Sequence, residues 1–294
     1  MLGRKFKGTC RKTVTAIGTK KKDPSKSKGK TAYNRKEKKQ PYVNHKKRAE
    51  GRKILSININ GLNSRPKRKR ILTKLIKQKV DIICIQETHI RKNDEKFLDC
   101  PKLGKLFTAP ADKHKKKGIA IYVRDDLKAD LIWADPEGRT LVVQILINCF
   151  TFLLIVIYAP NNDQGKFFKH LHQKIIGFEK GNICLIGNFN SIADYRKDYS
   201  NTSKNKKGKR EFSKPCKDMM NELNLADIWR KLNPKKEQFT YYSNPHKNWT
   251  RIDMAWINGE LVNEVKDSEI LPNDWADHNP IQIIKQYLAI VLSS

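Results

Sequence analysis

The feature that most constrains the fold of this chain is a series of short apolar runs that end abruptly in polar clusters. Residues 80–86 and 182–187 are two of these runs, and both have the length and β-branched content of buried strands. Residues 67–79 and 166–179 instead place apolar side chains at helical spacing. Strands that alternate with amphipathic helices favour a layered α/β fold, and we expect one such domain over residues 51–294.

The longest uncharged stretch, residues 141–159, is at the lower limit of length for a membrane-spanning helix. Its many β-branched residues favour two buried strands that meet near Asn148, with Pro160 ending the second. We therefore predict no association with a membrane.

Positive charge is concentrated at the start of the chain. Residues 1–50 carry 18 Lys and Arg against 3 Asp and Glu, a net of +15, so the total of +31 leaves +16 on residues 51–294. The first segment has few large apolar residues to offset its ordering entropy, and we predict a disordered basic arm. So large an excess exceeds the needs of solubility and predicts a polyanionic partner, with double-stranded DNA first and RNA as the alternative.

Basic clusters in this arm are candidates for DNA contact and for nuclear import: Lys20, Lys21, Lys22, Lys46, Lys47 and Arg48. We expect a nuclear location, and the acid-free residues 1–22 make a mitochondrial location the alternative. The six cysteines form no C-x-x-C pair, which fits a reduced intracellular compartment. No obligate protein partner is predicted.

Two acidic positions are candidates for metal chemistry. Glu87 ends a buried strand, where a lone carboxylate is costly without a cation or hydrogen-bond donors. Its hard oxygens suit Mg²⁺, or Mn²⁺ in its place. Asp277 and His278 together could supply a metal contact and a phosphate contact. The alternative for both positions is a solvated polar turn.

Amide, phenol and carboxylate groups follow the other runs. Asn58 and Asn190 can orient ligands or donate to an oxyanion, although asparagines in such turns often cap the backbone. Tyr158 can donate a hydrogen bond to phosphate. Asp253 lies within an apolar strand and requires a partner, either a structural arginine or a site histidine. Together these groups outline a metal-dependent phosphodiesterase site.

In this order the clusters resemble the motifs of the endonuclease/exonuclease/phosphatase superfamily, and most closely those of the endonuclease domain of long interspersed element (non-LTR) retrotransposons. The stretches that carry the resemblance are Asn58-Ile59-Asn60-Gly61-Leu62-Asn63, Cys84-Ile85-Gln86-Glu87-Thr88-His89, Ile157-Tyr158-Ala159-Pro160-Asn161, Phe239-Thr240-Tyr241-Tyr242-Ser243 and Arg251-Ile252-Asp253. The resemblance covers residues 53–287 and excludes the basic arm.

This resemblance implies a four-layered α/β sandwich of the DNase I-like type and magnesium-dependent nicking of one DNA strand. It also implies a role for each motif residue. Glu87 would hold the metal with Asn58 and Asp277, and Tyr158 and Asn190 would contact the scissile phosphate. His278 would stabilise that phosphate while Asp253 orients its imidazole, and Asn63 and Thr240 would lie near DNA.

The sequence departs from the family pattern at two positions. The family motif Gly-Asp-Phe-Asn uses its acid to orient and deprotonate the attacking water, but this chain has Asn188. Loss of a general base is typically worth about 10²- to 10⁴-fold in rate, so we expect hydrolysis to be weak or absent while DNA binding remains. Ala276 stands where the family has serine, a change that we expect to cost less.

Other functions stay open from the sequence. The chain could be an active magnesium-dependent endonuclease in which another group, such as Asp253, positions the water. It could also be a basic nucleic-acid-binding protein that acts through its arm. An abasic-site enzyme and a lipid or inositol phosphatase remain within the superfamily, and the positive charge favours nucleic acid. The 294 residues leave no room for a reverse transcriptase, so we expect no retrotransposition by this chain alone.

Overall fold

We obtained a computed structural model of the chain. It describes residues 51–110, 116–147, 150–178, 181–201, 211–273 and 276–286. Residues 1–50, with the six basic residues that are predicted to contact DNA, lie outside the described residues, and so does Asn148.

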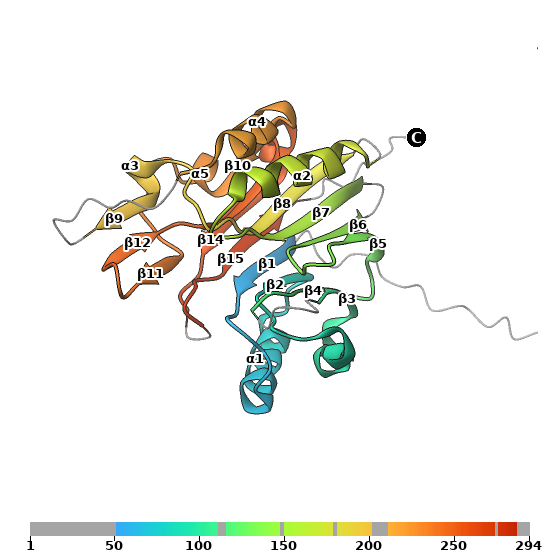
Figure 1. Cartoon of the computed structure of the whole chain (residues 1–294). Helices are drawn as coiled ribbons and strands as arrows, with labels where there is room; N and C mark the ends of the chain where they lie inside the picture. Colours follow the sequence, from blue (N-terminus) through green and yellow to red (C-terminus); the bar gives the residue numbers. More distant parts are fainter. Residues whose placement is uncertain are drawn as a thin grey trace, which may run out of the picture. The chain divides into compact units, whose positions relative to one another are not determined.

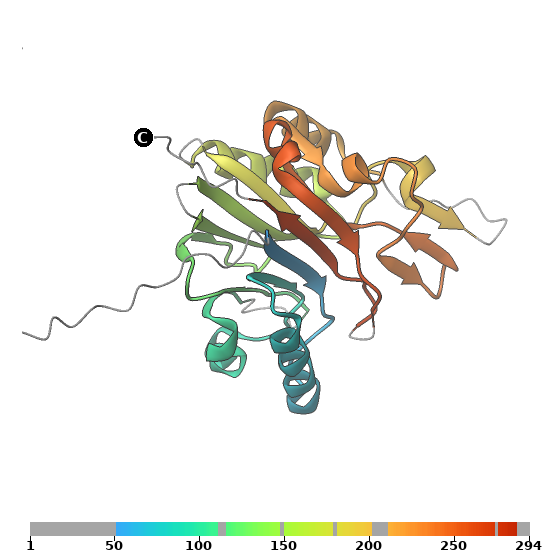
Figure 2. The ribbon, with the colours of Figure 1, turned by 180° about the vertical axis from the view of Figure 1, so that it is seen from behind.

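Among the described residues, the strands form two six-stranded sheets. In its spatial order, the first sheet contains β14 (Val265–Ile270), β15 (Ile281–Lys285), β1 (Arg52–Asn58), β2 (Ile82–Gln86), β4 (Ile119–Val123) and β3 (Lys105–Ala109). The second contains β10 (Leu225–Asp227), β13 (Asp253–Asn258), β8 (Asn182–Asn188), β7 (Phe150–Tyr158), β6 (Thr140–Ile147) and β5 (Lys128–Ala134). Figures 1 and 2 show the two sheets stacked against each other.

Helices cover the outer face of each sheet. The first sheet is covered by α1 (Arg65–Gln78) and the 3₁₀ turns η1 (Lys92–Leu98) and η2 (Pro101–Leu103), and the second by α2 (Gln164–Ile176) and α4 (Lys214–Glu222). The shorter helices are α3 (Tyr195–Asp198), α5 (Ile228–Leu232) and η3 (Gly259–Glu264). The order helix, sheet, sheet, helix confirms the predicted four-layered α/β sandwich.

The largest apolar cluster lies between the sheets. Side chains such as Ile121, Val143 and Leu154 are fully buried there. Two further clusters lie between a sheet and its helices: Ile71 and Leu75 of α1 pack on the first sheet, and buried side chains of α2 pack on the second. Each sheet is therefore buried on both faces, which explains why its strands read as continuous apolar runs rather than as alternating patterns.

The topology brings the polar strand ends together. β1 pairs with β2 in parallel through the crossover α1, and β7 pairs with β8 in parallel through α2. Parallel neighbours end at the same sheet edge, so Asn58 lies beside Gln86, and Tyr158 lies beside Asn188. β13 runs antiparallel to β8, so its first residue, Asp253, also pairs with Asn188.

A three-stranded sheet projects next to this edge. It consists of β11 (Tyr241–Ser243), β12 (Asn248–Thr250) and β9 (Tyr199–Asn201). An isolated bridge pairs Tyr241 with His278, and their rings lie 4.6 Å apart between centroids. The small sheet therefore packs directly against the polar cluster.

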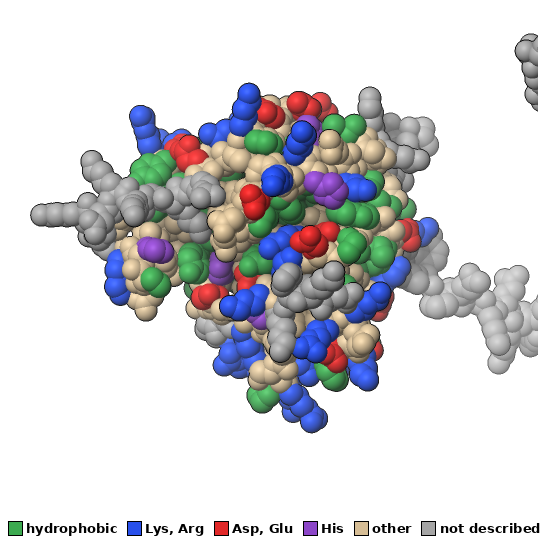
Figure 3. Space-filling view, in the orientation of Figure 1, with side chains coloured by type: hydrophobic (Ala, Val, Ile, Leu, Met, Phe, Trp, Pro, Cys, Tyr) green, Lys and Arg blue, Asp and Glu red, His purple; other side chains and the backbone are tan. Residues whose placement is uncertain are grey.

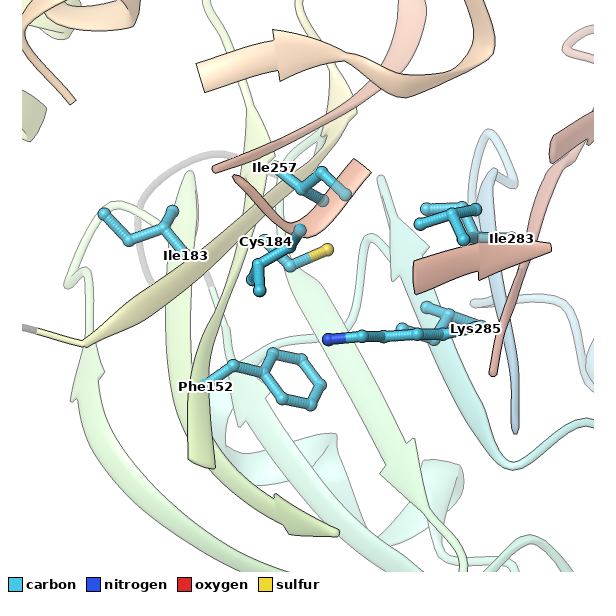
Figure 4. A pocket seen from close by; sticks show the side chains of 9 residues that line it. Phe152, Ile183, Cys184, Ile257, Ile283 and Lys285 are labelled. Carbon is cyan, nitrogen blue, oxygen red and sulfur yellow. The ribbon is translucent and has the colours of Figure 1, made fainter. Parts of the chain in front are cut away.

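A cavity of about 20 Å³ lies at the opposite end of the two main sheets, where β15 ends. Figure 4 shows the Lys285 side chain extending into it between Phe152 and Cys184. The Lys285 ammonium lies 3.6 Å from the centre of the Phe150 ring and 3.1 Å from a Glu264 carboxylate oxygen. These contacts satisfy the buried charge, so we assign this lysine to the stability of the core.

The sequence located most of the regular elements but not all of them. The predicted helix over residues 67–79 spans residues 65–78, and the predicted pair of strands within 141–159 forms β6 and β7, which pair along their whole length. Strands β3, β5, β9, β10 and β12 were not predicted. No described helix is long and apolar enough to cross a membrane.

Candidate active site

The polar residues that were predicted to act together do meet at one edge of the two sheets. We call this group the strand-end cluster, and its members are Asn58, Glu87, Tyr158, Asn188, Asn190, Asp253, Asp277 and His278. The parallel pairs described above bring Asn58, Tyr158 and Asn188 to this edge, and the antiparallel pair of β13 with β8 brings Asp253. The loops next to the strands bring the others.

Glu87 receives hydrogen bonds from both sheets. Asn58 Nδ2 donates to Glu87 Oε1 over 2.7 Å, and His89 Nε2 lies 3.4 Å from Oε2. The Tyr158 hydroxyl, from the second sheet, also hydrogen bonds the carboxylate. Burial by itself would raise the pKa of Glu87, but these hydrogen bonds outweigh burial and hold that pKa below its usual value. The carboxylate is therefore charged at neutral pH.

The backbone around this carboxylate is held in an uncommon conformation. Asn60, Glu87 and His89 all have φ between 47° and 57°, in the left-handed region that non-glycine residues seldom adopt. Gly61 N donates to Glu87 O over 2.7 Å, and Thr88 N donates to Gly118 O over 3.0 Å, which fixes the loop. Local strain of this kind is stored where the surrounding structure requires one arrangement of side chains.

Asn188 has only one possible amide orientation. Its Oδ1 accepts a hydrogen bond from the backbone N–H of Asn190 over 2.7 Å, so Nδ2 is the atom that faces away from this turn. That nitrogen is buried and has no hydrogen-bond partner among the described residues. The amide therefore offers two hydrogens at the place where a carboxylate would offer an acceptor.

Gly187 explains how Asn188 reaches this position. Its φ is 137°, and an added Cβ would lie 2.1 Å from the carbonyl oxygen of Ile157 on the neighbouring strand. A side chain at this position would push β8 away from β7 just before the cluster. Only glycine allows the two strands to stay paired up to Asn188.

Tyr158 and Asn190 lie on the other side of Glu87. Asn190 Nδ2 donates to the carbonyl of Ala159 over 2.7 Å, and the Asn190 side chain also hydrogen bonds the Tyr158 phenol. Burial and the nearby Glu87 carboxylate raise the pKa of Tyr158. The phenol therefore remains protonated and serves as a donor.

Asp253 and His278 form a buried pair. His278 Nδ1 lies 2.7 Å from Asp253 Oδ2, while Asp253 Oδ1 is buried without a partner among the described residues. Burial favours the neutral imidazole, but the Asp253 carboxylate outweighs burial and raises the pKa of His278 above its usual value. The partner of Asp253 is thus the site histidine and not a structural arginine.

Thr240 supports this pair from beneath. Its Oγ1 accepts hydrogen bonds from the backbone N–H of Ile252 at 3.0 Å and of Asp253 at 3.1 Å, and the residue is 1% exposed. The hydroxyl therefore positions Asp253, and the expected direct contact of this side chain with DNA has no support from its location. Asn63 is exposed on the loop before α1, and its contact with DNA stays a prediction.

Asp277 completes the cluster. Its Oδ2 accepts a hydrogen bond from Asn60 Nδ2 over 3.2 Å. Lys67 donates to the carbonyls of Ile59 and Asn60, each over 2.8 Å. Burial lowers the pKa of the Lys67 ammonium, and the nearby Asp277 and Glu87 carboxylates oppose this effect. A basic helix is thus attached to the edge that carries both carboxylates.

A comparison with known families agrees with this geometry. The model of the Endonuclease/Exonuclease/phosphatase family matches residues 55–278, from the first strand to the histidine of the buried pair. The chain belongs to this family.

Two curated proteins that are similar in sequence to this chain differ greatly in the share of their length that the chain covers. The chain is 24% identical over 238 residues to a transposon TX1 uncharacterized 149 kDa protein from Xenopus laevis, which covers 78% of this chain and 18% of that protein. It is 23% identical over 257 residues to an exodeoxyribonuclease from Bacillus subtilis, which covers 79% of this chain and 98% of that protein. The chain thus spans less than a fifth of the transposon protein, and the similarity to a transposon protein agrees with the resemblance of its motifs.

Solved structures of family members share the fold. AP endonuclease LMAP from Leishmania major superimposes with a TM-score of 0.67 at 17% identity and covers 81% of this chain and 89% of that one. The catalytic domain of Xenopus laevis APE2 gives a TM-score of 0.65 at 22% identity and covers 80% and 91%. These likenesses confirm the DNase I-like sandwich.

The oxygen donors of this family member fit a divalent ion of the magnesium type. Glu87 and Asp277 are connected through the Asn58 and Asn60 amides, and magnesium needs only one or two carboxylates because it retains several waters. Among the described residues no group of three or more His, Cys, Asp or Glu could hold a metal.

Asn58, which was predicted to be a metal ligand, uses both polar atoms of its side chain, one on Glu87 and one on the Asn60 N–H, so it positions Glu87.

Several residues of the cluster were not predicted. His89 and Asn60 were quoted only as parts of motifs, yet both lie against the carboxylates. Arg139 was missed: its Nη1 donates to Tyr158 O over 3.1 Å, and its guanidinium lies 5.3 Å from the centre of the Tyr158 ring. A turn that contains Gly138 before an apolar run gave no signal that the Arg139 side chain would contact Tyr158 on the neighbouring strand β7.

Proposed function

We propose that this chain is a DNA-binding protein of the nuclease fold in which phosphodiester hydrolysis is weak or absent. The observation that carries the proposal is the fixed Asn188 amide, whose buried nitrogen is a donor without a partner among the described residues. An amide cannot take the proton of an attacking water, whereas the carboxylate of the family motif can. Hydrolysis therefore lacks its general base while the rest of the cluster remains assembled.

The intact part of the cluster suits a phosphate group. The raised pKa of Tyr158 keeps its single proton in place, and the phenol can donate that proton to a phosphate instead of to Glu87. The Asp253 carboxylate raises the pKa of His278, so this imidazole takes up a proton more readily, and when protonated it provides a second donor and a positive charge for a phosphoryl oxygen. The Asn188 amide adds a third donor, so the same substitution that removes a base adds to anion binding.

We propose that Mg²⁺, or Mn²⁺, binds Glu87 and Asp277. A bound ion supplies Lewis-acid stabilisation of the phosphate and neutralises the two carboxylates. Asn58 holds Glu87 in place for this role through a hydrogen bond to Oε1, and His89 Nε2 lies 3.4 Å from Oε2.

We expect the cluster to bind Mn²⁺ even in the absence of hydrolysis. Replacing Glu87 with alanine should weaken Mn²⁺ binding at least about tenfold, because it removes a principal anionic ligand. Calorimetric titration of the full chain with MnCl₂ measures this directly. Asp267→Ala is the matched loss of one carboxylate on β14 and should leave Mn²⁺ affinity unchanged. Equal loss in both variants would contradict the assignment.

Double-stranded DNA is the partner that the charge supports best. Helix α1 contains seven basic residues and no acidic one: Arg65, Lys67, Arg68, Lys69, Arg70, Lys74 and Lys77. Such crowding opposes helix formation, because cations at the first turn oppose the helix dipole and like charges repel at i,i+4 spacing. Figure 3 shows Lys and Arg gathered at the end of the molecule where Figure 1 places α1. A polyanion would relieve this repulsion.

Reversing two of these charges should weaken duplex binding. We expect Lys69→Glu with Arg70→Glu to lower affinity for a short DNA duplex about tenfold or more, and to reduce the slope of log K against log salt by about two. Fluorescence anisotropy over a range of NaCl concentrations measures both quantities. Lys231→Glu with Lys266→Glu makes the same charge change on α5 and β14 and serves as the control.

The proposal is tested by incubating the full chain with supercoiled plasmid in magnesium. We expect plasmid to be bound and to stay supercoiled. A second candidate, an active endonuclease, is favoured by the buried Asp253 Oδ1, which could accept a proton from water. If the unaltered chain nicks plasmid at the same rate as an Asn188→Asp variant, the result contradicts the first proposal and supports the second.

The third possibility is that residues 1–50 dominate binding. Deleting them distinguishes the two sources of affinity: a domain that binds by itself keeps duplex affinity with a smaller salt slope. We keep a nuclear location as part of the proposal, to be checked by microscopy of a tagged chain.

A further inference from the structure

We infer that a groove beside the strand-end cluster binds an unpaired nucleotide of the DNA strand whose phosphate the cluster holds. This inference rests on the proposed function and adds the form of nucleic acid that the chain prefers. The groove lies between the β5–β6 turn and the start of α2, and its volume is about 670 Å³. Sites for nucleotide-sized ligands typically occupy about 300 to 1,000 Å³.

The groove combines aromatic walls with hydrogen-bonding groups. Trp133 and Phe167 provide apolar ring surface, and His170, Asn162 and Asp163 provide polar atoms. This combination is the chemistry that binds a nucleobase, since ring faces stack on any base and side-chain donors and acceptors meet its edge.

A β-bulge directs Trp133 into the groove. Leu131 pairs with Val143 and Trp133 pairs with Val142, so Ile132 is an extra residue in β5. In a regular strand Trp133 would share the face of Leu131, but the bulge turns it to the opposite face, toward α2. There its ring meets the His170 ring at 6.2 Å between centroids. Leu131 remains 52% exposed, so the bulge does not serve to bury the edge of the sheet.

Arg139 connects the groove with the cluster. It lines the groove, and its guanidinium also lies over the Tyr158 ring and donates to Tyr158 O. Lys166 stands further along the groove and is exposed. A strand that leaves the phosphate at Tyr158 would therefore meet two cations in sequence, and both can neutralise phosphates of its backbone.

The acidic residues of the groove either have partners within the protein or can accept a hydrogen bond from a base, so they do not exclude a nucleotide. Asp135 accepts hydrogen bonds from the backbone N–H groups of Glu137 and Arg139, at 3.3 and 3.0 Å. Glu137 pairs with Lys117 at 2.9 Å. Asp163 has a φ of 56° and makes no capping hydrogen bond to α2, so its carboxylate can accept from the amino group of a base.

The test compares two labelled DNAs, a blunt duplex and the same duplex with a short single-stranded gap, with the full chain. We expect the gapped duplex to bind more tightly, and Trp133→Ala to remove about tenfold of affinity for it while leaving the blunt duplex unchanged. Trp133→Phe should restore most of the preference because it keeps a stacking ring. Trp249→Ala, which removes a tryptophan from β12, is the control and should have no such selective effect.

The outcomes separate the inference from the proposed function. If the unaltered chain binds neither DNA, both fail. If it binds the two DNAs equally, and Trp133→Ala changes neither affinity or both alike, the groove inference is overturned while duplex binding stands. Phe167→Ala provides a second reading on the opposite wall of the groove, in case Trp133→Ala unfolds, and should also reduce only the gapped-duplex affinity.

Discussion

Replacing Asn188 with aspartate should raise plasmid nicking in magnesium by about 10²- to 10⁴-fold. The substitution is isosteric, and one carboxylate oxygen can keep the hydrogen bond from the Asn190 N–H. The other oxygen then replaces a buried nitrogen that has no partner among the described residues and becomes an acceptor for the attacking water. Conversion of supercoiled plasmid to nicked circles measures the change.

Two controls make this result specific. Asn188→Asp combined with Glu87→Ala should lose the restored activity, because the regained base would act in a site without its principal metal ligand. Asn182→Asp makes the same amide-to-acid change at the other end of β8 and should leave the rate unchanged. Equal nicking by the unaltered chain and by Asn188→Asp would mean that the amide is tolerated and that Asp253 or another group activates water.

Replacing Arg251 with methionine should lower the free energy of unfolding by about 3 to 5 kcal/mol. Arg251 is 1% exposed and donates to Asp198 at 2.8 and 2.9 Å and to Asp227 at 2.6 Å. Methionine fills much of the volume but leaves the Asp227 carboxylate without its ion-pair partner in the interior, while Asp198 keeps only Arg230. Urea unfolding of the full chain, followed by circular dichroism, measures the loss.

Arg52→Met is the matched control. Arg52 donates to Asp81 at 2.9 Å, but Arg124 lies 2.6 Å from the same carboxylate and stays in place. Because the Arg52 side chain is partly exposed, we expect a loss of at most about 1 kcal/mol. A loss as large as that of Arg251→Met would show that burial of the partners does not set the cost.

Arg251 lies two residues before Asp253, so replacing Arg251 should also disturb the buried pair of Asp253 and His278.

The cluster shows where sequence reasoning succeeds. Glu87, Tyr158 and Asn188 each stand at or next to the end of an apolar run, and parallel pairing leaves such ends at a common edge of a sheet. The burial of Asp253 in an apolar strand likewise required a partner, and His278 is that partner. Motif order then identified the family, which the match over residues 55–278 confirms.

The small sheet shows where it fails. Strands β9 and β12 have three residues each, too few for any periodic signal, and they pair with each other across a separation of about fifty residues in the chain. Arg139 and His89 reach the cluster for a related reason, since a turn residue takes its direction from the strands that it joins. The bulge in β5 is a property of pairing with β6 and has no mark in the sequence of either strand.

The sequence by itself determined the layered α/β class, the family, the acids and amides of the cluster and the amide at position 188, because apolar periodicity and residue chemistry are local properties. Only the tertiary structure decided that the Asn190 N–H fixes the orientation of the Asn188 amide, that Thr240 is buried and hydrogen bonds the backbone of Asp253, and that Trp133 turns toward α2. These features depend on the turn that follows β8 and on the register between paired strands, which the residues of one run do not determine.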